Sequence, residues 1–192
     1  MHTPIHEETY RNHTIKIIHD PDPESPREYD NLGTMNCWHR RYNFGDKHDY
    51  GDPRELLIDL CDLTYETDLS TNALFERASR RAVILSLYLY DHSGITMNTT
   101  GFHCPWDSGQ VGYIYVTLED IRKEYSVTRV SKNMRAKVAD YLRQEVQTYD
   151  HYLTGNCYGF VVEKDDDEVA SCWGFLGDYD GYCLAEAKYS VT

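Results

Sequence analysis

The sequence lacks several patterns by which a function is usually recognised. No apolar run approaches the roughly 18 residues that a membrane-spanning helix needs. The first eight residues have neither a basic start nor an apolar stretch, so no secretory signal is readable and we expect a cytoplasmic protein. Positive charge is scarce, because 19 Lys and Arg stand against 32 Asp and Glu, for a net charge of −13. Direct binding to nucleic acid is therefore disfavoured, since phosphate contacts need clustered basic residues.

The common catalytic and metal-binding motifs are also missing. Six cysteines occur without a Cys-x-x-Cys pair, which favours reduced, mostly buried thiols. Gly-x-Ser-x-Gly is absent, as is a phosphate-binding glycine loop of the Walker or Rossmann type. The acidic turns at 165–167 and 178–180 do not match the calcium loop of an EF-hand. The sequence therefore predicts no cofactor, no metal and no catalytic residue.

A few side chains leave an enzyme open as the alternative. Cys37 with His39, and His103 with Cys104, are two potential ligand pairs for a tetrahedral zinc ion, although their spacing matches no common zinc motif. The enzyme would be a metal-dependent hydrolase or nuclease acting on nucleic acid or on a signalling nucleotide. Its candidate residues are His39, His92, His103, Asp107 and Ser108. A third hypothesis is a virion or replication accessory protein, which no feature of the sequence supports.

Apolar residues are sufficient for a core, at 41% of the chain with 13% aromatic, so wholesale disorder is excluded. Residues 1–13 are predicted to form a flexible tail, and 14–192 a single α+β domain with a mixed or antiparallel sheet, one long helix and several short helices. Apolar patterning predicts strands at 14–19, 34–42, 83–90 (central), 95–100 (edge) and 111–116, and a hairpin of 158–163 with 169–175. The pattern of 83–90 alone also fits a buried helix. Capping residues and helical spacing predict helices starting at Asp52 and over 70–81, 117–125, 131–153 and 182–189.

Acidic residues gather at two places in the sequence. If the helix that starts at Asp52 persists far enough, five acidic residues spaced three or four apart share one of its faces. A second group lies in the turn of the predicted hairpin. The two groups are the candidate partner-binding residues: Asp52, Glu55, Asp59, Asp62 and Glu66, then Asp165, Asp166, Asp167 and Glu168.

Charge is also unevenly distributed along the chain. From Thr117 to Glu145 there are seven basic and five acidic residues, a local charge of +2, which leaves −15 for the remainder. The total of 13 negative charges equals the charge on roughly 22 Å of duplex DNA. A compact domain of this length is about 40 Å across. The charge therefore suffices to imitate DNA only if most of it lies on one face.

Three long motifs stand out: Ser25–Met35 leading into Cys37–Asn43, Cys104–Gly112, and Ser171–Phe175 followed by Gly177. Together they resemble a family of small acidic proteins encoded by bacteriophages and other mobile elements. The resemblance implies an origin in a phage and a task in the cytoplasm of a bacterial host. It carries over no catalytic residue.

The resemblance and the charge together favour an inhibitor over an enzyme. By analogy with antirestriction and anti-CRISPR proteins, we expect the chain to bind a host defence protein through that protein's basic nucleic-acid-binding surface. Imitation of DNA by the acidic residues is the expected means. Neither a nucleic acid nor a membrane is expected as a direct partner, and the oligomeric state is not predicted.

Overall fold

The computed structural model describes residues 3–191 and confirms the α+β class. All strand pairings are antiparallel. The strands are β1 His6–Tyr10, β2 His13–His19, β3 Thr34–Cys37, β4 Ala82–Asp91, β5 Ile95–Asn98, β6 Ser108–Thr117, β7 Cys157–Lys164 and β8 Asp167–Leu176. The helices are α1 Pro53–Leu60, α2 Thr71–Arg81, α3 Leu118–Glu124, α4 Lys132–Leu153 and α5 Leu184–Tyr189, with short turns of helix η1 Pro26–Glu28 and η2 Tyr179–Cys183.

The chain divides into two compact units. Unit 1 consists of both ends of the chain, Met1–Tyr29 and Thr148–Thr192, and unit 2 is Asp30–Gln147. The second boundary falls inside α4. That residues 14–192 fold as a single domain stays a prediction from the sequence. Residue 192 lies outside the described residues.

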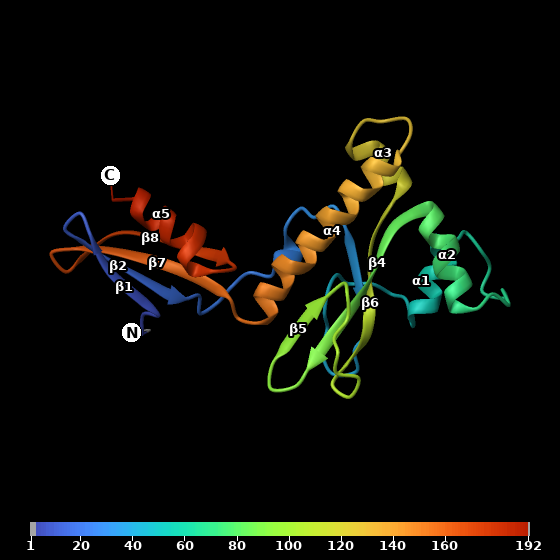
Figure 1. Ribbon diagram of the computed structural model, residues 1–192, viewed down its shortest axis with the longest axis horizontal. Helices are drawn as coiled ribbons and strands as arrows, with labels where there is room; N and C mark the ends of the chain where they lie inside the picture. The colour runs from blue at the N-terminus through green and yellow to red at the C-terminus, as the bar shows by residue number, and fades with distance from the viewer. Residues whose placement is uncertain (1–2, 192) are drawn as a thin grey trace. The chain divides into compact units, whose positions relative to one another are not determined.

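Unit 1 is built on a four-stranded sheet with the order β1-β2-β7-β8 (Figure 1). Helix α5 covers one face of this sheet, because Ala187 of α5 and Cys183, which directly precedes the helix, pack in one cluster with Ile17, Phe160 and Val162. The predicted hairpin is confirmed as β7 and β8. Two residues in the left-handed region form its turn, Asp165 at φ 52° and Asp166 at φ 70°.

Residues 6–10, which the sequence placed in a loose tail, form strand β1. His6 pairs with Ile17 across the sheet, and Arg11 and Asn12 make the turn to β2 with positive φ. The strand was not predicted because most of its side chains are polar. These side chains have partners elsewhere in unit 1, since Glu8 Oε1 lies 2.8 Å from Lys188 Nζ. Residues 1 and 2 of the predicted tail are outside the described residues.

Unit 2 is built on the second four-stranded sheet, with the order β3-β6-β4-β5 (Figure 1). The prediction of a central strand at 83–90 and an edge strand at 95–100 is confirmed by β4 and β5. Helices α1 and α2 cover one face, where Leu57 and Leu74 pack with Ile84. Strand β3 ends at Cys37, five residues earlier than predicted, because the chain then turns and the indole N–H of Trp38 donates to the Tyr50 carbonyl at 3.0 Å.

Within residues 3–191 no helix has both the length and the apolar composition that crossing a membrane requires.

The thiols give a direct test of these burial assignments. Cys172 is exposed and Cys104 half-buried, whereas the other four thiols are buried, and burial raises the pKa of Cys183 to about 12. Because the thiolate is the reactive form, we expect a thiol reagent at about pH 8 to modify Cys172 first and Cys104 next. Mass spectrometry after short labelling checks this order. Complete denaturation should expose all six, and rapid labelling of Cys183 in the folded protein would contradict the packing of α5.

Candidate functional site

The first acidic group does not form the single helix face that its spacing suggested. Helix α1 ends at Leu60 with Cys61 as its C-cap, and Asp62 has a left-handed backbone at φ 56°. Glu66 lies in the loop that follows. The predicted five-residue stripe is therefore reduced to three residues on α1 and its N-cap.

The three remaining acidic residues take part in the folding of unit 2. Asp52 accepts hydrogen bonds from the backbone N–H groups of Arg54 at 2.7 Å and Glu55 at 3.0 Å, as an N-cap does. Glu55 accepts the N–H of Gly51 at 2.7 Å. Asp59 accepts the hydroxyl of Tyr50 at 2.7 Å, and burial, followed by this bond, raises the pKa of that tyrosine. These carboxylates explain how α1 begins and how its neighbours are held, independently of any partner.

Basic residues also lie close to this group. Asp62 is 3.6 Å from Arg81. Asp59 lines an open hollow of about 430 Å³ together with Arg80, Arg81 and Arg122. The negative potential around α1 is therefore partly neutralised within unit 2.

The second acidic group remains a group of exposed carboxylates in the structure. Asp165, Asp166, Asp167 and Glu168 occupy the β7–β8 turn and the start of β8, and all four are exposed. Glu168 accepts the Ser171 hydroxyl at 2.8 Å. The three aspartates form no ion pair with any residue from 3 to 191, and Asp166 contributes only a minor part, after Glu163, to raising the pKa of Lys16. Their charge is therefore available to a partner.

The two acidic groups belong to different units, and the units differ strongly in charge. Unit 1 contains 15 acidic and five basic residues, a net charge of −10, whereas unit 2 contains 17 acidic and 14 basic residues, a net charge of −3. Unit 1 is the smaller of the two. The negative charge is therefore a property of unit 1, and the sequence did not reveal this because the unit is assembled from both ends of the chain.

Little of the charge of unit 1 is neutralised by lysine. Lys16 Nζ lies 2.6 Å from Glu163 and Lys188 Nζ lies 2.8 Å from Glu8. The hydrogen bond from Lys188 is the main cause that lowers the pKa of Glu8. Lys164 is the one basic residue near the acidic turn in the sequence, and 165–187 contains seven acidic residues and no Lys or Arg.

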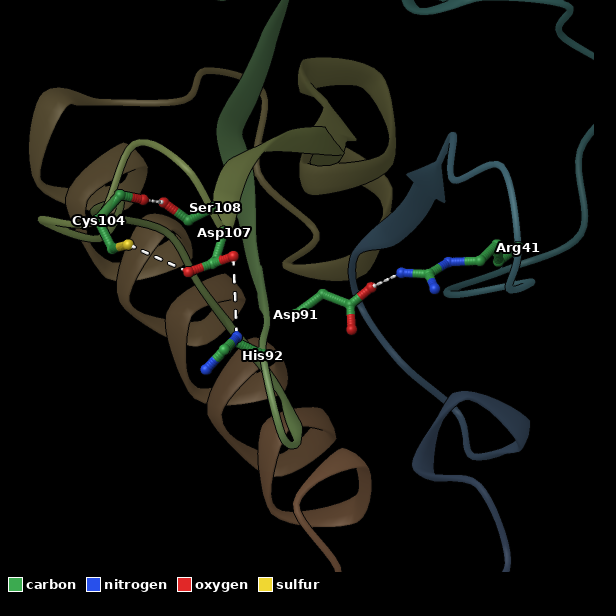
Figure 2. A network of polar contacts seen from close by, with 6 residues as sticks. All are labelled: Arg41, Asp91, His92, Cys104, Asp107 and Ser108. Atoms are coloured by element: carbon green, nitrogen blue, oxygen red, sulfur yellow. Dashed lines mark hydrogen bonds and ion pairs between the residues drawn. The ribbon is translucent and has the colours of Figure 1, made fainter.

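The residues of the enzyme alternative lie in unit 2, at one end of its sheet. Figure 2 shows Asp107 between two partners: its Oδ2 is 3.5 Å from Cys104 Sγ and its Oδ1 is 3.8 Å from His92 Nδ1. The Ser108 hydroxyl donates to the Cys104 carbonyl, and Arg41 pairs with Asp91 from β4 (Figure 2). The bonds to Cys104 close the 104–108 turn, and the backbone N–H of Asp91, which donates to the Asp107 carbonyl at 2.9 Å, joins that turn to β4.

This network has the character of a structural turn. The Ser108 hydroxyl is directed to a backbone carbonyl, so no histidine activates it as a nucleophile. His39 stacks on Tyr42 with ring centroids 5.3 Å apart, and His103 is exposed. Among residues 3–191 no three His, Cys, Asp or Glu side chains gather as potential metal ligands, so the two potential ligand pairs do not come together as a zinc site.

No protein family, curated protein or solved structure matches the chain. The resemblance to phage-encoded proteins therefore stays a prediction.

Two exposed features of the structure were not predicted from the sequence. Trp106 is 92% exposed and lines an open hollow of about 390 Å³ together with Arg40. Strand β8 is an edge strand whose residues 171–174 are all exposed. The sequence located this strand at 169–175, but no residue pattern indicated that it lies at the edge of the sheet.

Proposed function

We propose that this protein is an inhibitor, encoded by a bacteriophage or mobile element, that binds a host defence complex through its acidic unit 1. The observation that carries the proposal is the net charge of −10 on unit 1 against −3 on unit 2. Restriction and CRISPR complexes hold DNA phosphates with clustered Lys and Arg. The carboxylates of unit 1 pair with those cations through charge-assisted hydrogen bonds and exclude the nucleic acid.

The charge of unit 1 is adequate for this task. Ten net charges equal those on about 17 Å of duplex DNA. A unit of 74 residues is about 29 Å across. If most of these charges lie on one face of unit 1, that face has somewhat more than half the linear charge density of the duplex, enough to accelerate association with a cationic surface.

The test is displacement of DNA from purified restriction and CRISPR effector complexes. Labelled duplex is bound to each complex, and the protein is titrated at about 50 mM and about 300 mM salt. We expect displacement from at least one complex at low salt, with an apparent affinity about tenfold lower at high salt. No displacement from any complex, or displacement unaffected by salt, would contradict the proposal.

Two variants then locate the surface on the protein. Replacing the second acidic group by Asp165→Asn, Asp166→Asn, Asp167→Asn and Glu168→Gln removes four charges, and asparagine tolerates the positive φ of the turn. We expect about tenfold weaker displacement from slower association. The control in unit 2 is Asp52→Asn, Glu55→Gln and Asp59→Asn, which removes three charges and keeps the hydrogen-bond acceptors. A larger loss of DNA displacement by the control variant would place the binding surface at α1 instead.

A further inference from the structure

We infer that the free edge of β8 accepts an extended, lysine- or arginine-rich segment of the partner as a fifth strand of the unit 1 sheet. This inference rests on the proposed function and specifies the kind of contact. Strand β8 has ten residues and a single neighbour, β7, in the sheet order β1-β2-β7-β8. An edge strand presents a row of backbone donors and acceptors, which is a template for another strand.

The side chains of β8 suit such an addition. Val169 is 54% exposed and Trp173 is 43% exposed, and Ser171 and Cys172 between them are exposed as well. A Cβ atom added at Gly159 would lie 2.1 Å from the Trp173 ring, so the indole is fixed against the backbone of β7. Val169 and Trp173 thus offer two partly exposed apolar side chains, one at each end of the regularly paired residues 170–172.

The pairing geometry limits where the new strand lies. Register shifts occur between Tyr158 and Phe160 and between Val162 and Glu163, and between them Ala170, Ser171 and Cys172 pair regularly with β7. The N–H of Gly174 is already donated to Asp20 at 3.1 Å. The open part of the edge is therefore centred on 170–172 and ends before Gly174.

The acidic residues on both sides of β8 favour a positively charged strand as its binding partner. Residues 169–177 are uncharged, Asp165–Glu168 precede them, and Asp178 and Asp180 follow. A cationic strand placed along this edge has carboxylates near both of its ends. A second copy of this chain would instead bring two units of charge −10 together, which like-charge repulsion opposes.

The probe is a blocked seven-residue peptide of alternating lysine and valine, added to the full chain at low salt. We expect binding to protect backbone amides within 168–173 from hydrogen exchange and to leave those of β1, the opposite edge, unchanged. Val169→Lys should weaken binding about tenfold, since lysine repels the peptide and blocks edges. Thr9→Lys on β1 adds the same charge to the other exposed edge and should change the affinity less than about threefold.

A peptide with N-methyl groups on alternate backbone nitrogens separates strand pairing from general attraction. It keeps the charge but loses donors, so we expect its binding to be lost. Absence of binding by the unmethylated peptide, equal binding of both peptides, equal effects of the two lysine substitutions, or a dimer paired through β8 would each overturn the inference. The peptide assay contains no defence complex, so its failure removes the edge as a site, whereas failure of DNA displacement removes the proposed function.

Discussion

Gly112→Ala is expected to lower the free energy of unfolding of unit 2 by about 3 kcal/mol. Gly112 lies in β6 opposite Cys37 of β3. A Cβ atom added there would lie 2.1 Å from the Asn36 carbonyl oxygen and 2.9 Å from Cα of Cys37. Both obstacles are backbone atoms of a paired strand, so β3 must move and its hydrogen bonds with β6 must lengthen. Chemical denaturation followed by circular dichroism measures the change.

Gly109→Ala is the matched control for this substitution. Gly109 lies in the same strand, and a Cβ atom added there meets no atom within 4 Å. We expect a change within about 0.5 kcal/mol, as for exposed positions that lack special contacts. Equal destabilisation by the two substitutions would contradict the close approach of β3 and β6.

Ile17→Ala is expected to destabilise unit 1 by about 3 kcal/mol, because it removes apolar contacts and leaves a cavity beneath α5. Ile17 is fully buried in β2 and belongs to the cluster that includes Phe160 and Ala187. Hydrogen exchange of the full chain measures the effect in each unit separately. If the two units unfold independently, faster exchange should be confined to unit 1.

The neighbouring residue gives the control for the cavity. Ile18 points to the other face of the sheet and is half-buried, so Ile18→Ala should cost about 1 kcal/mol. Accelerated exchange throughout both units in Ile17→Ala would support the single cooperative domain predicted from the sequence. A cost for Ile18→Ala as large as that for Ile17→Ala would contradict the position of α5 on the sheet.

The sequence predicted those elements whose burial pattern is local. Strand β4 was recognised by its continuous apolar run, and α4 by its helical period between Ser131 and Gly155. The division into units was not predictable, because its boundary falls within α4, where the helical period continues without glycine, proline or a change in composition. Strand β1 was missed because its polar side chains are held by contacts with residues more than 170 positions away, such as Glu8 with Lys188.

The candidate site was predictable only where its pattern is local in the sequence. The acidic turn at 165–168 was located correctly on its hairpin, since Asp165 and Asp166 favour a tight turn between alternating strands. The end of α1 was not predicted, because no glycine or proline marks it and Asp62 adopts the left-handed conformation instead. The concentration of charge in unit 1 depends on long-range assembly of the two chain ends, which no sequence window contains.

Hydrogen exchange on the complex with the defence protein that releases its DNA tests the central claim most directly, because it locates both surfaces in one measurement. We predict protection within residues 165–180 of this chain, with amides near α1 unchanged, and protection of the partner along the surface that otherwise binds DNA. Protection confined to unit 2, or protection of the partner away from its DNA-binding surface, would contradict the assignment of the inhibitory surface to unit 1.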